Sequence, residues 1–519
     1  MFCKYYMELT LLDAPGARCL DGSPAGFYHR RGRQDRWVLY LEGGGWCYTP
    51  AQCRHRARNE HTGSSLEWPR TWAGAKFGPL SDSATINPEF HDASHVFVKY
   101  CDGASFAGNS DLETHGMTLF FRGRRILASV LSHLQQAKYG LGASVGTELL
   151  LAGCSAGGLA VILNADRVRL LLPPTVTKFK AVAGSGFFVH APNAAGDDII
   201  GWQMRQVYFM QNLSATLSVG CQRSQPLGEE WRCVMAPYAV AHVRTPLFVI
   251  DSTIDKWQLL CTHNARALPQ DSYTSYMAAC GTLWPHDLFS PCLSGWDASL
   301  IADCTAERAG SIRDFATAFS AQIASTGLLG ARRPHGPHEL LPHGLLPHGL
   351  FLTTCDSHCG LQYADWFEAR LSPVAGSGAA SGAASEAGTT AVQAHSSGSV
   401  VGGARSFSMQ QALGLWWRDD QSGASAHTYL PCELNEQWPY QCNPTCPDVP
   451  GLRSGRLGAL GLTSVGITCA LCACLAILLR VRVRFAGAGL LGTSRRGRTQ
   501  TGTPTAPEVQ LPWRHLDSL

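Results

Sequence analysis

The stretch "LLLAGCSAGGLAVIL", residues 149–163, joins an apolar run, a glycine-rich turn and a helix-like pattern. Its centre, Gly153-Cys154-Ser155-Ala156-Gly157, is a G-x-S-x-G motif between a strand and a helix, the context in which this motif presents a nucleophilic serine. The glycines permit a sharp, strained turn that lifts the Ser155 hydroxyl above the sheet and aims the Ala156 amide at the same point. The motif therefore predicts a serine nucleophile on a strand–turn–helix unit.

Short apolar runs bounded by turn residues recur on both sides of this motif, and each is typical of a buried strand. Between them, residues 119–134 and 159–172 have the apolar spacing of helices. This alternation predicts an α/β fold with a central, mostly parallel sheet flanked by helices. The expected strands are Trp37–Leu41, His95–Tyr100, Glu148–Ala152, Phe179–Ala183 and Pro246–Asp251.

A serine of ordinary basicity needs a base and an acid that orients the base. In α/β-hydrolase-like folds the acid follows a late strand, and the histidine comes later still. The segment "PLFVIDSTIDKWQL" offers Asp251 and Asp255, and spacing does not choose between them. His358 in "TTCDSHCGL" is the candidate base, because two cysteines flank it and can fix its loop. The histidines that compete for this role are His263, His286, His395 and His427.

The segment "LEGGGWC", residues 41–47, ends an earlier strand with three consecutive glycines. Glycine is costly to order, so a plain tight turn explains one of them but not three. The tetrahedral intermediate of ester hydrolysis needs two or three N–H donors for its oxyanion, and a glycine-rich loop after an earlier strand supplies some of them. We therefore expect Gly44, Gly45 and Ala156 to form an oxyanion hole, with Trp46 in the wall of the substrate pocket.

The composition of the 519-residue chain suits a large globular core, since 45% of the residues are hydrophobic and 16% are charged. A formal net charge of +3, without a basic face, does not favour a nucleic-acid partner. Twenty cysteines are scattered along the chain, which indicates several disulfides in an oxidising compartment. A reduced protein with buried thiols is the alternative. The pairing of the cysteines does not follow from the sequence.

Residues 457–479, "LGALGLTSVGITCALCACLAILL", contain no charged residue and are long enough to cross a bilayer as one helix. Three arginines in "RVRVRF" follow, so the positive-inside rule places the tail in the cytoplasm and the larger part outside or in a lumen. A buried core helix and a cleaved lipid-anchor signal are the alternatives, and the basic tail argues against the second. No signal peptide is visible, because "MFCKYYMELT" is too short and too polar. Either the N-terminus is incomplete or export begins by another route.

Two segments have the character of insertions, at about residues 329–350 and 373–406. The first holds the tandem repeat "LLPHGLLPHGLF", whose His343 and His348 lack an acidic or cysteine partner, so we expect a surface-loop duplication and not a metal site. The second, "GSGAASGAASEAG" at its centre, has the composition of a flexible linker. An aromatic and cysteine-containing segment follows it, which indicates that the domain continues to about residue 448.

The ordered motifs from Met7 to Asp448 resemble the plant-type pectin acetylesterases and the related Notum carboxylesterases of animals. The resemblance is carried by "LYLEGGGWC", "YCDGASFAGN", "LAGCSAGGLA", "RTPLFVIDSTIDKWQL", "TTCDSHC" and "YQCNPTCP". The family nucleophile falls on Ser155, and the family histidine, followed by cysteine, falls on His358. The family pattern D-x-W-Q matches residues 255–258, so the resemblance assigns the acid to Asp255.

The resemblance implies a serine carboxylesterase with an α/β-hydrolase-like fold. We expect it to act as a monomer and to need no metal or cofactor. The expected substrate is an acyl ester, foremost an acetyl ester, on a polysaccharide such as pectin. A Notum-like deacylase that removes a fatty-acyl ester from a protein is the second hypothesis. A catalytically silent surface protein that binds glycans is the third. The expected organisation is an N-terminal extension (1–6), an esterase domain (7–448), a juxtamembrane segment (449–456), a transmembrane helix (457–479) and a basic cytoplasmic tail (480–519).

Overall fold

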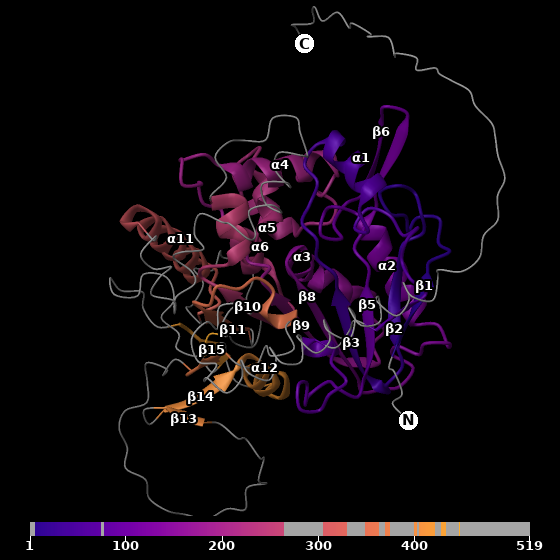
Figure 1. Cartoon of the computed structure of the whole chain (residues 1–519). Coiled ribbons are helices and arrows are strands. Elements are labelled where there is room, and N and C mark those ends of the chain that lie inside the picture. The colour runs from indigo at the N-terminus through magenta and orange to yellow at the C-terminus, as the bar shows by residue number, and fades with distance from the viewer. Residues whose placement is uncertain are drawn as a thin grey trace, which may run out of the picture. The chain divides into compact units, whose positions relative to one another are not determined.

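The computed structural model describes residues 6–73, 77–263, 305–329, 348–362, 369–373, 399–401, 404–420, 427–431 and 446. All of these residues belong to one compact unit that runs from residue 1 to residue 452. Within the described residues, a ten-stranded sheet forms the centre of this unit (Figure 1). Seven neighbouring strands of the sheet are parallel, and three strands at one edge are antiparallel. The predicted central, mostly parallel sheet is confirmed.

The elements have the following bounds. In sheet order, the parallel strands are β15 (Thr428–Tyr429), β11 (Gly349–Thr353), β10 (Leu247–Ser252), β9 (Val176–Gly184), β8 (Thr147–Cys154), β3 (Arg33–Leu41) and β5 (Ala93–Val98), followed by the antiparallel β2 (Gly26–Arg30), β1 (Met7–Leu11) and β4 (Thr71–Trp72). Two small sheets consist of β6 (Ser110–Thr114) with β7 (Met117–Phe121), and of β12 (Arg370–Leu371), β14 (Ala404–Ser408) and β13 (Ser399–Val401). The α-helices are α1 (Pro50–Asn59), α2 (Gly123–Leu134), α3 (Ala156–Leu171), α4 (Ile199–Met210), α5 (Val219–Ser224), α6 (Ala236–Ala239), α7 (Lys256–Gln258), α11 (Ala306–Ser325) and α12 (Met409–Arg418). Shorter helical turns are η1 (Gly78–Leu80), η2 (Glu230–Val234), η3 (Val240–His242), η4 (Leu259–His263) and η5 (Gly360–Gln362).

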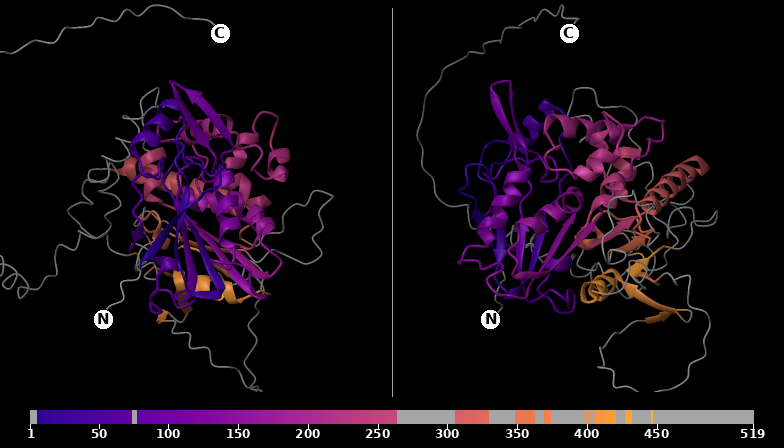
Figure 2. Two further views of the ribbon diagram at one scale, coloured as in Figure 1. Left: turned by 90° about the vertical axis from the view of Figure 1, so that its right-hand side faces the viewer. Right: turned by 180° about the vertical axis from the view of Figure 1, so that it is seen from behind.

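Both faces of the central sheet are covered, which explains why its strands are continuous apolar runs. Successive side chains of a strand point to opposite faces. In β3 and β8, Leu39 and Leu151 therefore pack with α2, α3, α4 and α11, whereas Val38 and Leu150 pack in a second cluster with α12. Figure 1 and the two views of Figure 2 show α12 on the side of the strands away from α3. The core thus consists of two apolar layers, one on each face.

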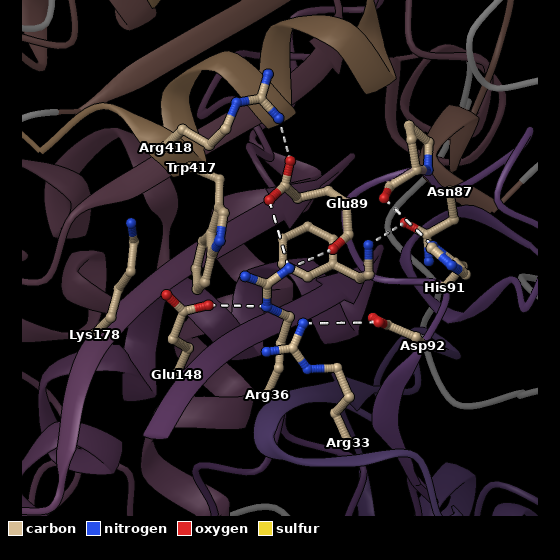
Figure 3. A network of polar contacts seen from close by, with 12 residues as sticks. Arg33, Arg36, Asn87, Glu89, His91, Asp92, Glu148, Lys178, Trp417 and Arg418 are labelled. Atoms are coloured by element: carbon tan, nitrogen blue, oxygen red, sulfur yellow. Dashed lines mark hydrogen bonds and ion pairs between the residues drawn. The ribbon is translucent and has the colours of Figure 1, made fainter. Parts of the chain in front are cut away.

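A network of charged side chains joins α12 to the amino-terminal ends of β3 and β8 (Figure 3). Arg36 of β3 pairs with Glu148 of β8 at 2.8 Å and lies 3.8 Å from Glu89, which also pairs with Arg418 of α12. The buried Lys180 donates hydrogen bonds to carbonyl groups at the end of α12, the nearest at 2.7 Å, where the helix dipole is negative. These contacts make α12 part of the same domain as the parallel sheet.

The predicted helix over residues 119–134 is wrong in its first four residues. Leu119–Phe121 belong to β7, which pairs antiparallel with β6, and α2 begins only at Gly123. Gly116 closes the hairpin with a φ of 71°, and aromatic and β-branched residues favour a pleated strand over a helix. Backbone pairing with β6 therefore outweighs the helical spacing of a few apolar residues.

The first predicted insertion ends too late. Gly349 and Leu350 belong to β11, where they pair in parallel with β10. His348 is buried, and its Nδ1 accepts a hydrogen bond from the Leu247 amide at 3.1 Å. The last histidine of the repeat thus holds the beginning of a central strand and is not in a surface loop. Residues 330–347, with His343, lie outside the described residues.

The second predicted insertion also ends too late. Residues 399–401 form β13, and residues 404–406 are the first part of β14, with which β13 pairs antiparallel. Residues 374–398 lie outside the described residues. Backbone pairing thus extends into a segment whose composition resembles that of a linker.

No helix among the described residues combines the length and the apolar character that crossing a bilayer requires. The predicted span, residues 457–479, and the basic tail after it lie outside the described residues.

His95 of β5 should make the fold sensitive to acid. The Arg30 guanidinium can only donate, so His95 Nδ1 accepts at 2.7 Å, and His95 Nε2 donates to the Phe90 carbonyl at 2.7 Å. Burial, together with the Arg30 charge, lowers the pKa of His95 to about 3. Because an unfolded histidine takes up a proton near pH 6.5, His95 stabilises the fold fully above that pH and loses this contribution as the pH falls toward 3.

We expect the titration of His95 to lower the free energy of unfolding by about 1.6 kcal/mol as the pH falls from 6.5 to 5. Denaturant unfolding at a series of pH values, with wild type and His95→Gln, measures this. In His95→Gln the free energy of unfolding should fall less steeply with decreasing pH, by about 0.7 kcal/mol per pH unit at pH 6.5 and about 1.3 kcal/mol per pH unit at pH 5. Equal slopes for the two proteins would show that His95 is not the acid-sensitive group.

Candidate active site

Ser155 lies at the end of β8, one residue before α3 begins. Its φ of 60° and ψ of −130° are rare for a residue with a side chain, and its amide donates to the Gly184 carbonyl at 3.0 Å. A Cβ atom on Gly153 would lie 2.4 Å from the Gly157 carbonyl oxygen, and one on Gly157 would lie 2.2 Å from that of Leu41. Both glycines of the motif are therefore needed for close backbone contact. The turn has the strained form that the motif predicts.

The glycine run of residues 43–45 lies against this turn. A Cβ atom on Gly43 would lie 3.0 Å from the Ser155 Cβ and 3.4 Å from the Ala156 amide nitrogen. Gly44 and Gly45 have φ values of 150° and 63°. Sequence reasoning named Gly44 and Gly45 but missed Gly43, the glycine nearest to Ser155. Its position as the first of the three glycines, next to the strand, was the available signal.

In the part of the chain that the structure describes, the amide groups of this run make no internal hydrogen bond. Among the described residues, none accepts a hydrogen bond from the amides of Gly43, Gly44, Gly45 or Trp46. Ala156 is the first residue of α3, so its amide has no acceptor within the helix. Donors of this kind, next to a serine, are what an oxyanion requires. The assignment of Gly44, Gly45 and Ala156 to an oxyanion hole stays a prediction.

His358 is bound to Asp255. The His358 Nδ1 lies 2.7 Å from the Asp255 Oδ2, and Asp255 is completely buried. The other oxygen of Asp255 accepts the Gln258 amide at 2.9 Å, which caps α7. Because Nδ1 is bound to the acid, a proton from Ser155 would go to Nε2. This pairing is the one that the D-x-W-Q resemblance implies.

The other acidic candidate, Asp251, does not face the histidine. Its two carboxylate oxygens accept the amides of Phe187 at 3.0 Å and Ser252 at 2.8 Å. Burial, together with the negative charge of Asp255, raises the pKa of Asp251 well above its usual range. Asp251 thus supports the backbone beside the site, and Asp255 alone of the two holds His358.

Two of the histidines that competed for the role of the base form hydrogen bonds to residues other than Asp255. His263 bonds to Ser311 at 2.8 Å, and His427 bonds to Asp419 at 2.9 Å. His286 and His395 lie outside the described residues.

The three predicted catalytic residues follow different strands of the parallel sheet. Ser155 follows β8, Asp255 lies three residues after β10, and His358 lies five residues after β11. The carboxyl ends of parallel strands meet at the same edge, which is where open α/β sheets place their sites. The sheet order therefore brings together residues that are far apart in the sequence.

Two disulfides hold the loop of His358. Cys359, the next residue, is bonded to Cys154, which directly precedes Ser155. Cys355, at the beginning of the loop, is bonded to Cys446. The sequence had indicated that the flanking cysteines fix this loop but not their partners. The predicted disulfides are confirmed, and the others that the structure describes are Cys19–Cys101, Cys47–Cys53 and Cys221–Cys233.

Removal of the Cys154–Cys359 disulfide should reduce ester hydrolysis strongly. The double variant Cys154→Ala/Cys359→Ala should lose about 10- to 100-fold in kcat, because a displacement of His358 by about 1 Å is enough for a loss of this size. The control is Cys221→Ala/Cys233→Ala, which removes a disulfide between α5 and η2 and should keep kcat within about twofold. Circular dichroism establishes that both proteins are folded. Equal losses in the two variants would mean that the disulfide acts only on stability.

Two aromatic rings lie beside His358. The Trp257 ring stacks on the imidazole at 6.0 Å with an angle of 30°, and the Phe188 ring lies 6.4 Å away. Trp46 packs edge-on against Phe188 at 4.8 Å and against Trp257 at 5.8 Å. Trp46 is only 3% exposed, and its Nε1 donates to Ser105 at 2.8 Å, so it supports the other rings more than it lines an open surface. Sequence reasoning missed Phe188 and Trp257, although Trp257 belongs to the D-x-W-Q motif.

Residues 3–282 match the sequence pattern of the pectinacetylesterase family. The chain belongs to this family. The matched residues include Ser155 and Asp255 and end before His358. His358 itself lies outside the matched residues. It is connected to them by the Cys359–Cys154 disulfide and by its hydrogen bond to Asp255.

Individual relatives fall into two groups. Pectin acetylesterase 7 of Arabidopsis thaliana is 34% identical over 249 residues, which are 47% of this chain and 61% of that protein. The palmitoleoyl-protein carboxylesterase NOTUM of Mus musculus is 34% identical over 270 residues, 49% of this chain and 51% of that protein. The chain thus spans about half to three fifths of the length of these relatives.

The structure of the Wnt deacylase Notum from Drosophila is similar to this fold. It has 23% sequence identity and a TM-score of 0.58, and the likeness covers 85% of this chain and 100% of that one. At this identity the likeness establishes the fold alone, an α/β-hydrolase fold like that of Notum.

Proposed function

We propose that this protein is a serine carboxylesterase that hydrolyses acyl esters. The observation that carries the proposal is the position of His358. His358 is hydrogen-bonded to Asp255 through Nδ1, and the next residue, Cys359, forms a disulfide with Cys154, the residue before Ser155. A base that is oriented by a buried acid and fixed next to a serine on a strained turn is the arrangement of a Ser-His-Asp mechanism.

The mechanism follows from these roles. His358 Nε2 takes the proton of the Ser155 hydroxyl as the oxygen attacks the ester carbonyl, and Asp255 stabilises the imidazolium. The oxyanion that forms accepts hydrogen bonds from Ala156 and the glycine loop. The ester bond then breaks, and His358 gives its proton to the leaving alcohol. Water, deprotonated by His358, hydrolyses the acyl-enzyme and restores Ser155.

We propose an acetyl ester on a polysaccharide such as pectin as the substrate. Pectin acetylesterases are among the relatives, and bulky rings occupy the space beside His358. A short acyl group fits such a crowded place better than a long chain. The second candidate is a fatty-acyl ester on a protein, which the relatives named as palmitoleoyl-protein carboxylesterases support.

Purified protein should be assayed for acetate release from acetylated pectin and for hydrolysis of matched chromogenic acetate and long-chain esters. We expect kcat/KM for the acetyl ester to be at least about tenfold higher, since a pocket that excludes methylene groups discriminates by 1–3 kcal/mol. A preference for long-chain esters would contradict the acetyl assignment and support the deacylase. Glycan binding without hydrolysis would support the catalytically silent alternative.

We further propose that residues 457–479 anchor the enzyme in a membrane, with the esterase domain on the extracellular or luminal side. The uncharged span and the arginines after it support this orientation. The disulfides of the described domain support an oxidising compartment. Asn212 of the sequon Asn212-Leu213-Ser214 is exposed, as a glycan acceptor must be.

Protease treatment of intact cells or sealed vesicles tests this orientation. We expect the domain to be digested and a C-terminal epitope to be protected. Glycosidase treatment should shift the mobility of the wild type but not of Asn212→Gln. A domain that is protected on the cytosolic side would contradict the proposed orientation.

A further inference from the structure

Arg56 is a buried cation beside the glycine loop. Helix α1 follows this loop directly and carries Arg54, Arg56 and Arg58. Arg58 is exposed, as arginine usually is, whereas Arg56 is only 1% exposed. Removing a guanidinium from water costs several kcal/mol unless its partners compensate for the loss. Its partners are therefore informative about its role.

The guanidinium of Arg56 has few partners for a buried cation. Its Nη2 donates to the Gly44 carbonyl at 2.7 Å, and its Nε lies 3.4 Å from a carboxylate oxygen of Glu60. Among the described residues, nothing accepts a hydrogen bond from its Nη1. The shorter of these two contacts of Arg56 is thus with the loop next to Ser155.

The contact with Gly44 determines the direction of the next amide. The described peptide bonds are all trans, and in a trans peptide the carbonyl oxygen and the following N–H point to opposite sides. Because Arg56 holds the Gly44 carbonyl on one side, the Gly45 N–H points to the other side.

Tyr100 acts in the same way on the next peptide. Its hydroxyl donates to the Gly45 carbonyl at 2.8 Å, which turns the Trp46 N–H away from Tyr100. Burial raises the pKa of Tyr100, so this hydroxyl stays a donor. Two buried side chains, Arg56 and Tyr100, therefore each hold one carbonyl group of the loop.

We propose that Arg56 is a positioning residue of the oxyanion site: it fixes the Gly44–Gly45 peptide with its N–H toward the reacting ester and adds a positive charge behind that peptide. This inference rests on the proposed esterase function. A cation that donates to a peptide carbonyl polarises the peptide and strengthens its N–H as a donor. The effect grows as negative charge develops on the ester oxygen, so it favours the transition state over the bound substrate.

The experiment compares Arg56→Met, Arg56→Lys and the control Arg58→Met in the full chain. Methionine keeps the bulk of the side chain without the charge, and lysine keeps the charge without the planar fork. We expect a fall in kcat of about 100-fold for Arg56→Met and about tenfold for Arg56→Lys, with KM within about threefold. Arg58→Met should stay within about twofold of the wild type.

Binding of a trifluoromethyl ketone inhibitor distinguishes a role of Arg56 in positioning the oxyanion donors from a role in protein stability alone. Ser155 adds to its carbonyl carbon, the serine proton passes to His358, and the ketone oxygen becomes an oxyanion in the same place as in the reaction. In the Arg56 variants, the affinity for this ketone should fall relative to the wild type by the same factor as kcat/KM. The affinity for the corresponding alcohol, which forms no oxyanion, should not change.

An unchanged kcat in folded Arg56→Met would overturn the proposal, as would a fall in kcat without a loss of ketone affinity. If Arg56→Met does not fold, Arg56→Lys decides by the same two measurements. A wild type without esterase activity, or a Ser155→Ala variant that keeps it, would contradict the proposed function itself and not only the role of Arg56.

Discussion

Ser155→Ala should lose ester hydrolysis by at least about 10⁴-fold in kcat. Without the hydroxyl, no acyl-enzyme can form, and the remaining rate would come from substrate binding and the oxyanion donors alone. The loss should not come from unfolding. The Ser155 backbone contact, from its amide to the Gly184 carbonyl, does not involve the hydroxyl. An alanine in the same turn should leave the unfolding temperature within a few degrees of the wild type.

A fluorophosphonate probe provides a second measurement for Ser155. It forms a covalent bond with an activated serine and releases fluoride, so mass spectrometry should find one labelled residue in the wild type and none in Ser155→Ala. Ser224→Ala, on the exposed part of α5, is the matched control and should be labelled and active like the wild type. Equal hydrolysis by Ser155→Ala and wild type would refute the serine mechanism.

Asp255→Asn should lower kcat by about 10³- to 10⁴-fold. The carboxylate of Asp255 accepts the proton of His358 Nδ1, which leaves Nε2 as the proton acceptor for Ser155. An asparagine can present its NH₂ group instead and favour the other tautomer, in which Nε2 carries the proton and cannot act as a base. The loss should appear in kcat and much less in KM, because Asp255 is buried behind His358 and does not reach the substrate.

Asp251→Asn is the matched control, since it makes the same change four residues earlier. Asp251 accepts backbone amides and does not contact His358. Burial, together with the charge of Asp255, raises the pKa of Asp251, so an uncharged residue at position 251 is a small electrostatic change. We expect a loss in kcat of less than about tenfold, with a change in unfolding temperature as the main effect. A larger loss in Asp251→Asn than in Asp255→Asn would reverse the assignment of the acid.

The local parts of the site could be predicted from the sequence because their signals are local. The strand–turn–helix around Ser155 needs glycine at two positions for backbone contact, and the run of residues 43–45 has the same requirement. The central strands are apolar on both faces, which is visible in any window of a few residues. The boundaries at Leu119 and Gly349 were predicted less well, because pairing with a distant strand decides them.

Two facts about the candidate site depend on which segments meet in space. Asp251 and Asp255 are equivalent by spacing alone. The D-x-W-Q resemblance favours Asp255, and the contact itself depends on the position of His358 after β11. The partner of Cys359 is 205 residues away, at the residue before Ser155.

The sequence by itself determined the parallel sheet, the turn of Ser155 and the glycine loop, since backbone sterics and apolar periodicity act over a few neighbouring residues. Resemblance added Asp255 and His358 as partners. Only the tertiary structure decided how these parts meet. It placed the disulfide between the histidine loop and Cys154, and the buried Arg56 against the Gly44 carbonyl. The physical reason is that a contact between distant segments depends on the order of the strands in the sheet, and no short stretch of sequence contains that order.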